Sequence, residues 1–158
     1  MASILENEGF DDITIAAGWS HDTVEDHPEK WTFDMFERWL NHPDAPALIR
    51  LQRAVTYNFE YRDPEIRRGW YLHALTQTPE AMPISAADLL DYLRDDNLHY
   101  RNGIDALRVL GLNPMKEVTY LVAFLSMMKS QAGRDPRLNR IVEALREEIG
   151  ILRQYIER

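Results

Sequence analysis

The chain has 158 residues, 45% of them hydrophobic, which is enough to bury one sizeable core and too few for two comfortable domains. Its 26 acidic and 18 basic residues leave a formal net charge of -8, so the summed field disfavours nucleic acid and anionic membranes as partners, although a small phosphorylated ligand needs only a local cluster of cations. The absence of cysteine excludes disulfides and cysteine nucleophiles, and the lack of a long apolar run or an N-terminal signal pattern predicts a cytoplasmic protein with no membrane span.

The N-terminal segment predicts two helices separated by a turn. Residues 2–8 are typical of a helix that ends at Gly9, because glycine is the usual left-handed residue after a helix. Asp11 or Asp12 can cap the next helix, which has a polar segment at its C-terminal end. The pair His27-Pro28 ends this pattern, because the residue before a proline is disfavoured in the helical conformation.

A short aromatic helix capped by Thr32 is predicted next. We expect its aromatic side chains to join the core rather than to form a ligand platform. The predicted inner face consists of Phe33, Phe36, Trp39 and Leu40. A further helix is predicted from Asp44 to Tyr57, since Pro46 is tolerated in a first turn and the leucine spacing suits burial.

Three later helices begin with a capping side chain followed by a proline, which suits the first helical position. The pairs are Asp63-Pro64, Asn113-Pro114 and Asp135-Pro136. Between the first two, the stretch from Ser85 to Asp88 is similar to a capping box that opens another helix, and a separate helix is expected from Leu98 to Leu110, ending at Gly111. The helix after Pro114 is strongly apolar and should end at Gly133, which makes it the expected central helix.

The last helix has apolar residues at alternating spacings of four and three, which is typical of a seam between packed helices. The seam consists of Leu138, Val142, Leu145, Ile149, Leu152 and Ile156. It is either the final helix of the bundle or the contact of a homodimer. The chain therefore predicts one all-α domain, residues 1–158, with about seven or eight helices and a C-terminal helical pair.

The most unusual segment is His21-Asp22-Thr23-Val24-Glu25-Asp26, which places two metal-type ligands next to each other and two further carboxylates close behind. A histidine and an aspartate can bind one divalent cation, while Glu25 and Asp26 can face a substrate or an attacking water. The alternative is a polar helix end that happens to contain this pair. These six residues alone favour neither interpretation.

With the preceding residues, Ile4 to Ala17, this segment resembles the HD-domain metal phosphohydrolases, most closely the guanosine tetraphosphate hydrolase domains of the RelA/SpoT family. A second segment, Ala81 to Leu90, is similar to the part of that family that contains its last aspartate ligand. The two segments occur in the family's order, and the HD-like part covers residues 2–94. The helices of residues 97–158 add nothing specific to this resemblance.

The resemblance implies roles for five residues. His21, Asp22 and Asp88 correspond to metal ligands, and Glu25 and Asp26 correspond to the acidic pair that the RelA/SpoT hydrolases use next to the attacking water. The implied cofactor is a divalent cation, manganese or iron, which activates water and neutralises the phosphate under attack. The implied substrate is a nucleotide or a related phosphate ester.

The sequence departs from the family's pattern at several positions. The family's first histidine ligand is expected a few residues before Met1, so either the start is shortened or the site is lost. Ser85 stands where the family usually has lysine, and Tyr92 where it often has a nucleotide-contacting asparagine. A missing ligand should weaken metal binding substantially. His73 is the best substitute ligand, although a helical histidine beside Trp70 is more often a boundary residue.

Two hypotheses for the function result. The chain is either an HD-type phosphohydrolase weakened by the missing ligand, or a degenerate HD-like domain that binds a ligand or a protein. Several arginines could bind phosphate or simply form a solvated face, namely Arg53, Arg62, Arg67 and Arg68. A homodimer is also predicted, either through the last helix or through an uncovered apolar face near Ile4, Leu5 and Ile15.

Overall fold

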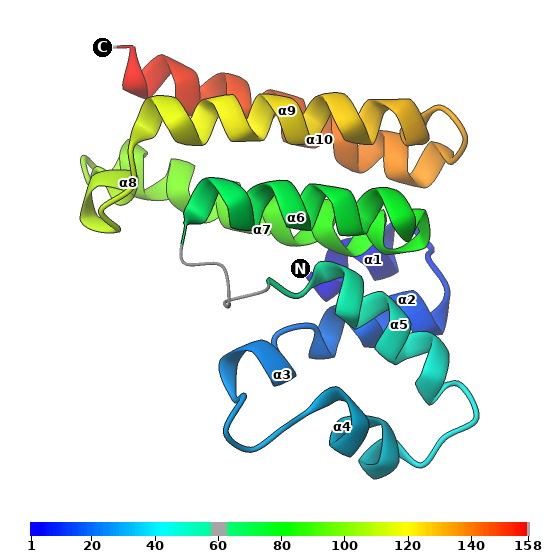
Figure 1. Ribbon diagram of the computed structural model, residues 1–158. Coiled ribbons are helices and arrows are strands. Elements are labelled where there is room, and N and C mark those ends of the chain that lie inside the picture. The colour runs from blue at the N-terminus through cyan, green and yellow to red at the C-terminus, as the bar shows by residue number, and fades with distance from the viewer. Residues whose placement is uncertain (58–62, 158) are drawn as a thin grey trace. The chain divides into compact units, whose positions relative to one another are not determined.

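The computed structural model describes residues 1–57 and 63–157, and in these residues all regular structure is helical, without a strand (Figure 1). The all-α prediction is confirmed. The described residues form ten α-helical segments, of which α3 (Thr23–Asp26) and α8 (Ala106–Val109) have only four residues each. No helix in this part of the chain is long and apolar enough to cross a membrane. The chain divides into two compact units, Met1–Ser85 and Ala86–Arg158.

The first unit is organised around α5, which packs against α2, α4 and α6. Figure 1 shows α2 and α5 side by side. The elements of this unit, besides α3 and the start of α7 (Met82–Arg101), are α1 (Ala2–Asn7), α2 (Asp12–Ser20), α4 (Phe33–Leu40), α5 (Ala45–Val55), α6 (Pro64–Gln77) and the 3-10 helix η1 (Pro79–Ala81).

Four predicted boundaries in this unit are confirmed, namely the end of α1 and the starts of α2, α4 and α6. Gly9 has a φ of 74° after α1, and the Asp11 carboxylate caps α2 by accepting a hydrogen bond from the Thr14 amide at 2.9 Å. Thr32 caps α4, and Asp63 caps α6. Side chains that accept from the first free amides of a helix act within four residues, so the sequence reveals them.

Two predictions about buried faces in the first unit are wrong. Trp39, which was expected in the core, is 65% exposed, whereas Phe36 on the same helix is buried. Because α4 is only two turns long and packs against α5 with one face, Trp39 stacks on Phe36 from outside at a ring distance of 5.7 Å. Leu5, which was expected on an uncovered face, is fully buried, while Ile4 and Ile15 are half-buried.

The predicted boundaries around α7 are also wrong. This helix begins at Met82, so Asp88 lies in its second turn, which excludes the capping-box interpretation of Ser85 to Asp88. The helix then continues through Asp95-Asp96 to Arg101, and the left-handed residue Gly103, with a φ of 77°, follows it. The predicted helix from Leu98 to Leu110 is therefore divided between the end of α7 and the short α8.

The second unit contains the rest of α7, α8, and the long helices α9 (Pro114–Ala132) and α10 (Pro136–Ile156), which run side by side in Figure 1. Asn113 and Asp135 cap these two helices as predicted. Five of the six seam residues of α10 are buried: Leu138, Val142, Leu145, Ile149 and Leu152. The packing of α10 along α9 supports the bundle alternative for the seam. The homodimer itself stays a prediction.

Candidate functional site

His21 lies directly after α2, and both of its ring nitrogens face oxygen atoms. Its Nδ1 is 2.9 Å from the carbonyl oxygen of Gly18, and its Nε2 is 2.8 Å from Oδ1 of Asp22. A carbonyl oxygen only accepts, so Nδ1 must donate a proton to Gly18. The Nε2 atom then faces a second acceptor. This contact requires either a proton or a cation between Nε2 and Oδ1.

The end of α2 is fixed by a buried glutamine of α5. The Gln52 side chain is fully buried, and its Nε2 donates to the Ser20 carbonyl at 2.6 Å and to the Ser20 hydroxyl at 2.8 Å. The same hydroxyl donates to the carbonyl of Ala16 at 2.7 Å. Gln52 therefore holds the residue that immediately precedes His21 and sets where the His21 backbone begins.

Gln52 was not predicted as a functional residue, although a signal for it exists. It lies on the same helix as Leu48, Leu51 and Val55, which are all buried, and it continues their stripe. A polar side chain on an apolar stripe must find a hydrogen-bond partner. The partner is Ser20, which lies 32 residues away in the sequence, so no local pattern around Gln52 identifies it.

Glu25 on α3 is held by the backbone that follows α5. Its Oε2 accepts a hydrogen bond from the Tyr57 amide at 2.9 Å. Burial raises the pKa of Glu25, and the negative charges of Asp22 and Asp26 raise it further, against the opposing effects of the Tyr57 amide and His21. Of these groups, Asp22 and Asp26 are both exposed. The structure thus couples Glu25 electrostatically to Asp26 and to the predicted ligands His21 and Asp22.

Asp88, the third predicted ligand, belongs to the second unit and is half-buried on α7. It lines an open pocket of about 550 Å³ together with Asp91, Tyr92, Arg94, Asp95 and Leu98. Within residues 1–57 and 63–157, no group of three or more histidine, aspartate or glutamate side chains is arranged to hold a metal ion. The role of Asp88 as a ligand stays a prediction.

The two residues at which the sequence departs from the HD pattern both have structural partners. Ser85 is 3% exposed, and its hydroxyl forms a hydrogen bond with the hydroxyl of Tyr71. Tyr92 forms a hydrogen bond with the carboxylate of Asp96. Each replacement is therefore part of the hydrogen bonding of its own unit.

The substitute ligand His73 is exposed on α6, and its ring lies edge-on to Trp70 at a centroid distance of 5.9 Å. This contact supports the interpretation of His73 as a boundary residue, and its role as a ligand stays a prediction. Among the arginines, Arg53 lies over the Phe33 ring at 4.5 Å and pairs with Asp34 at 3.0 Å.

The remaining phosphate candidates are less informative. Arg67 and Arg68 are half-buried on α6, and both take part in interactions. Arg62 lies outside the described residues. A phosphate-binding role for these arginines therefore stays a prediction.

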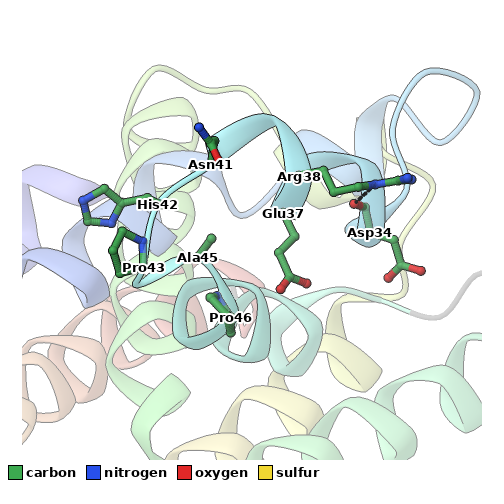
Figure 2. Close-up of a pocket in the computed structure, with 8 residues that line it drawn as sticks. All are labelled: Asp34, Glu37, Arg38, Asn41, His42, Pro43, Ala45 and Pro46. Atoms are coloured by element: carbon green, nitrogen blue, oxygen red, sulfur yellow. Dashed lines mark hydrogen bonds between the residues drawn. The ribbon is translucent and has the colours of Figure 1, made fainter.

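A second hollow lies where α4 turns into α5 (Figure 2). It is an open pocket of about 980 Å³, and the side chains around it come from α4, the following loop and the first turn of α5. They are Asp34, Glu37, Arg38, Asn41, His42, Pro43, Ala45 and Pro46. Arg38 is held on its own helix by donating to the Asp34 carbonyl at 3.0 Å. The lining mixes both charges and includes none of the predicted site residues.

The resemblance to the HD hydrolases is therefore a likeness of two short segments, one of which contains the His21–Asp22 contact. The whole chain matches no protein-family model, no curated protein and no solved structure.

Proposed function

We propose that the chain is a metal-dependent phosphohydrolase acting on a nucleotide or a related phosphate ester, and that His21 and Asp22 contribute two ligands to a divalent cation. The observation in support is the 2.8 Å contact between His21 Nε2 and Asp22 Oδ1. Because Gly18 fixes the proton on Nδ1, the lone pair of a neutral His21 points at a carboxylate, which is the tautomer that metal-binding histidines adopt. A nitrogen and a carboxylate oxygen suit manganese or iron.

Such a cation, when bound, supplies Lewis-acid polarisation of the phosphoryl group. Glu25 is the residue we assign as the general base that takes the proton from the attacking water. Its raised pKa makes it a stronger base than an ordinary glutamate, and the Tyr57 amide holds the carboxylate in one orientation. Asp26, which is exposed, acts on Glu25 through its charge.

A non-catalytic ligand-binding or protein-interaction module is the second candidate, and one feature of the same contact favours it. If His21 is doubly protonated, the imidazolium satisfies both Gly18 and Asp22 without a metal. The pair then serves as an ion pair that closes the end of α2. The two candidates differ in what they predict for metal binding.

Binding of Mn²⁺, followed by electron paramagnetic resonance, distinguishes the candidates. The hydrolase requires one Mn²⁺ per chain and at least about a tenfold loss of affinity in each of His21→Ala and Asp22→Asn. His42→Ala is the matched control, because His42 is an exposed histidine paired with a neighbouring aspartate in the same unit. Unchanged Mn²⁺ affinity in the two site variants argues for the module. Stoichiometric Mn²⁺ without phosphate release from any nucleotide tested contradicts the assigned reaction but not the metal site.

A further inference from the structure

The second unit has two acidic side chains in its interior. Asp96 on α7 is 4% exposed, and Glu117 on α9 is 6% exposed. Removing a carboxylate from water is costly unless donors or a cation compensate for the lost hydration. Asp95, its neighbour in the chain, has an exposed side chain and carries no such cost. Whether Asp96 is ionised therefore depends on the hydrogen-bond donors and charges around it.

The hydrogen bonds of Asp96 do not compensate for a full negative charge. Tyr92, one turn earlier on α7, provides one hydrogen bond to the carboxylate. The second oxygen, Oδ2, is buried and has no hydrogen-bond partner among the described residues. An ionised carboxylate can accept about four hydrogen bonds, whereas a protonated one turns one oxygen into a donor. A proton on Oδ2 removes the charge and leaves the Tyr92 contact intact.

The surrounding charges also favour the protonated form. On α7, the groups that act on Asp96 are Asp95 and His99, and on α9 it is Glu117. Burial is the largest cause that raises the pKa of Asp96, and the charges of Asp95 and Glu117 add to it, against the Tyr92 hydrogen bond and His99.

From α10, the acidic residue Glu148 contacts this stretch of α7. Glu148 lies 3.7 Å from Arg94 through Oε1, and it accepts from the Asn97 side chain at 2.7 Å through Oε2. Arg94, the cation of this set, is thus engaged with Glu148. Tyr100, on α7, interacts with Asp96 electrostatically and hydrogen-bonds to Asp105.

We propose that Asp96 carries a proton in the folded protein and that its ionisation, next to Glu117, makes the interior of the second unit a pH-sensitive element. A proton bound more tightly in the folded state stabilises that state at low pH. The contribution is fully present below the ordinary aspartate pKa of 3.8 and is lost as the pH rises through the raised value. For each pH unit by which folding raises the pKa of Asp96, the folding equilibrium constant changes by up to about tenfold.

Hydrogen exchange of the full chain tests this proposal in peptides from α7 and α9. It is measured by mass spectrometry from pH 5 to pH 8 and corrected for intrinsic exchange rates. Protection should fall with rising pH in the wild type. In Asp96→Asn, whose amide replaces the protonated carboxyl group, protection should vary little with pH and should exceed the wild-type value at pH 8. Asp95→Asn is the matched control, because it removes an exposed neighbour and leaves Asp96 able to ionise. Protection should still fall with rising pH in this variant, and the fall should move to lower pH because the Asp95 charge no longer raises the pKa of Asp96.

A wild-type slope in Asp96→Asn, or protection that rises with pH in the wild type, overturns the proposal. If Asp96→Asn does not fold, carboxyl carbon NMR of the wild type decides the question directly, because the Asp96 signal must titrate above the range of exposed aspartates. Titration at or below that range overturns the proposal. Glu117→Gln removes one of the charges that favours the protonated form, so it should shift the Asp96 titration to lower pH.

Discussion

Replacement of Gln52 separates its packing role from its hydrogen-bonding role. Both Gln52→Leu and Gln52→Ala delete the two bonds to Ser20, which costs about 1–3 kcal/mol if the Ser20 carbonyl is left unpaired. Both also remove the buried Oε1 atom, which has no hydrogen-bond partner among the described residues, and this removal returns a similar amount, roughly 1–3 kcal/mol. Leucine fills the same space, so the net change should be within about 1 kcal/mol, whereas alanine adds a cavity cost of about 2–4 kcal/mol.

Urea unfolding followed by tryptophan fluorescence is the suitable assay, because all four tryptophans lie in the first unit with Gln52. The leucine variant should unfold near the wild-type midpoint, and the alanine variant well below it. Gln77→Leu and Gln77→Ala are the controls, since Gln77 is exposed at the end of α6. If leucine destabilises the unit as strongly as alanine, the reasoning is refuted, and the bonds to Ser20 rather than packing hold α2 on α5.

Three further predictions follow from individual side chains. In Gly18→Ala, the new Cβ would lie 2.7 Å from a methyl group of the buried Leu5, so an overpacking cost of about 1–3 kcal/mol should exceed the gain in helix propensity of about 1 kcal/mol. Thermal melts should therefore show a less stable protein, whereas the control Gly69→Ala, where the Cβ meets open space, should be more stable than the wild type. If Glu25 is the base, phosphate release should rise with pH through its raised pKa, and Asp26→Asn should move that rise to lower pH; an unmoved profile excludes the coupling. Asp135→Ala should cost about 0.5–2 kcal/mol in hydrogen exchange of α10, an effect lost as the pH falls because the pKa of Asp135 is lowered in the folded state.

Helix starts were predictable because the residues that define them interact locally. Asp63, Asn113 and Asp135 each accept hydrogen bonds from amides two or three residues ahead, and a proline follows each of them. The sequence contains both partners of such an interaction within one turn. Propensity and capping then agree with the fold, and no tertiary information is needed.

The candidate site was only partly predictable for the same reason. His21 and Asp22 are adjacent, so their contact is visible as a dipeptide. The partners that position them are not, because Gln52 reaches Ser20 across 32 residues. Sequence spacing can suggest that Gln52 is buried, but it cannot name the oxygen atoms that its amide meets. The resemblance to a known family suggested roles for the predicted ligands, but it did not reveal the Gln52–Ser20 hydrogen bonds that position them.

Asp96 shows how register within a helix decides between surface and interior. Adjacent residues of an α-helix point about 100° apart, because there are 3.6 residues per turn. Asp95 points to solvent, whereas Asp96 follows Leu93 by three residues on the buried face. The stripe of Leu90 and Leu93 therefore predicts a buried position at 96 once polar residues are allowed on it. The protonation of Asp96 cannot be predicted in this way, because one of the charges that opposes its ionisation comes from Glu117 on a different helix, α9.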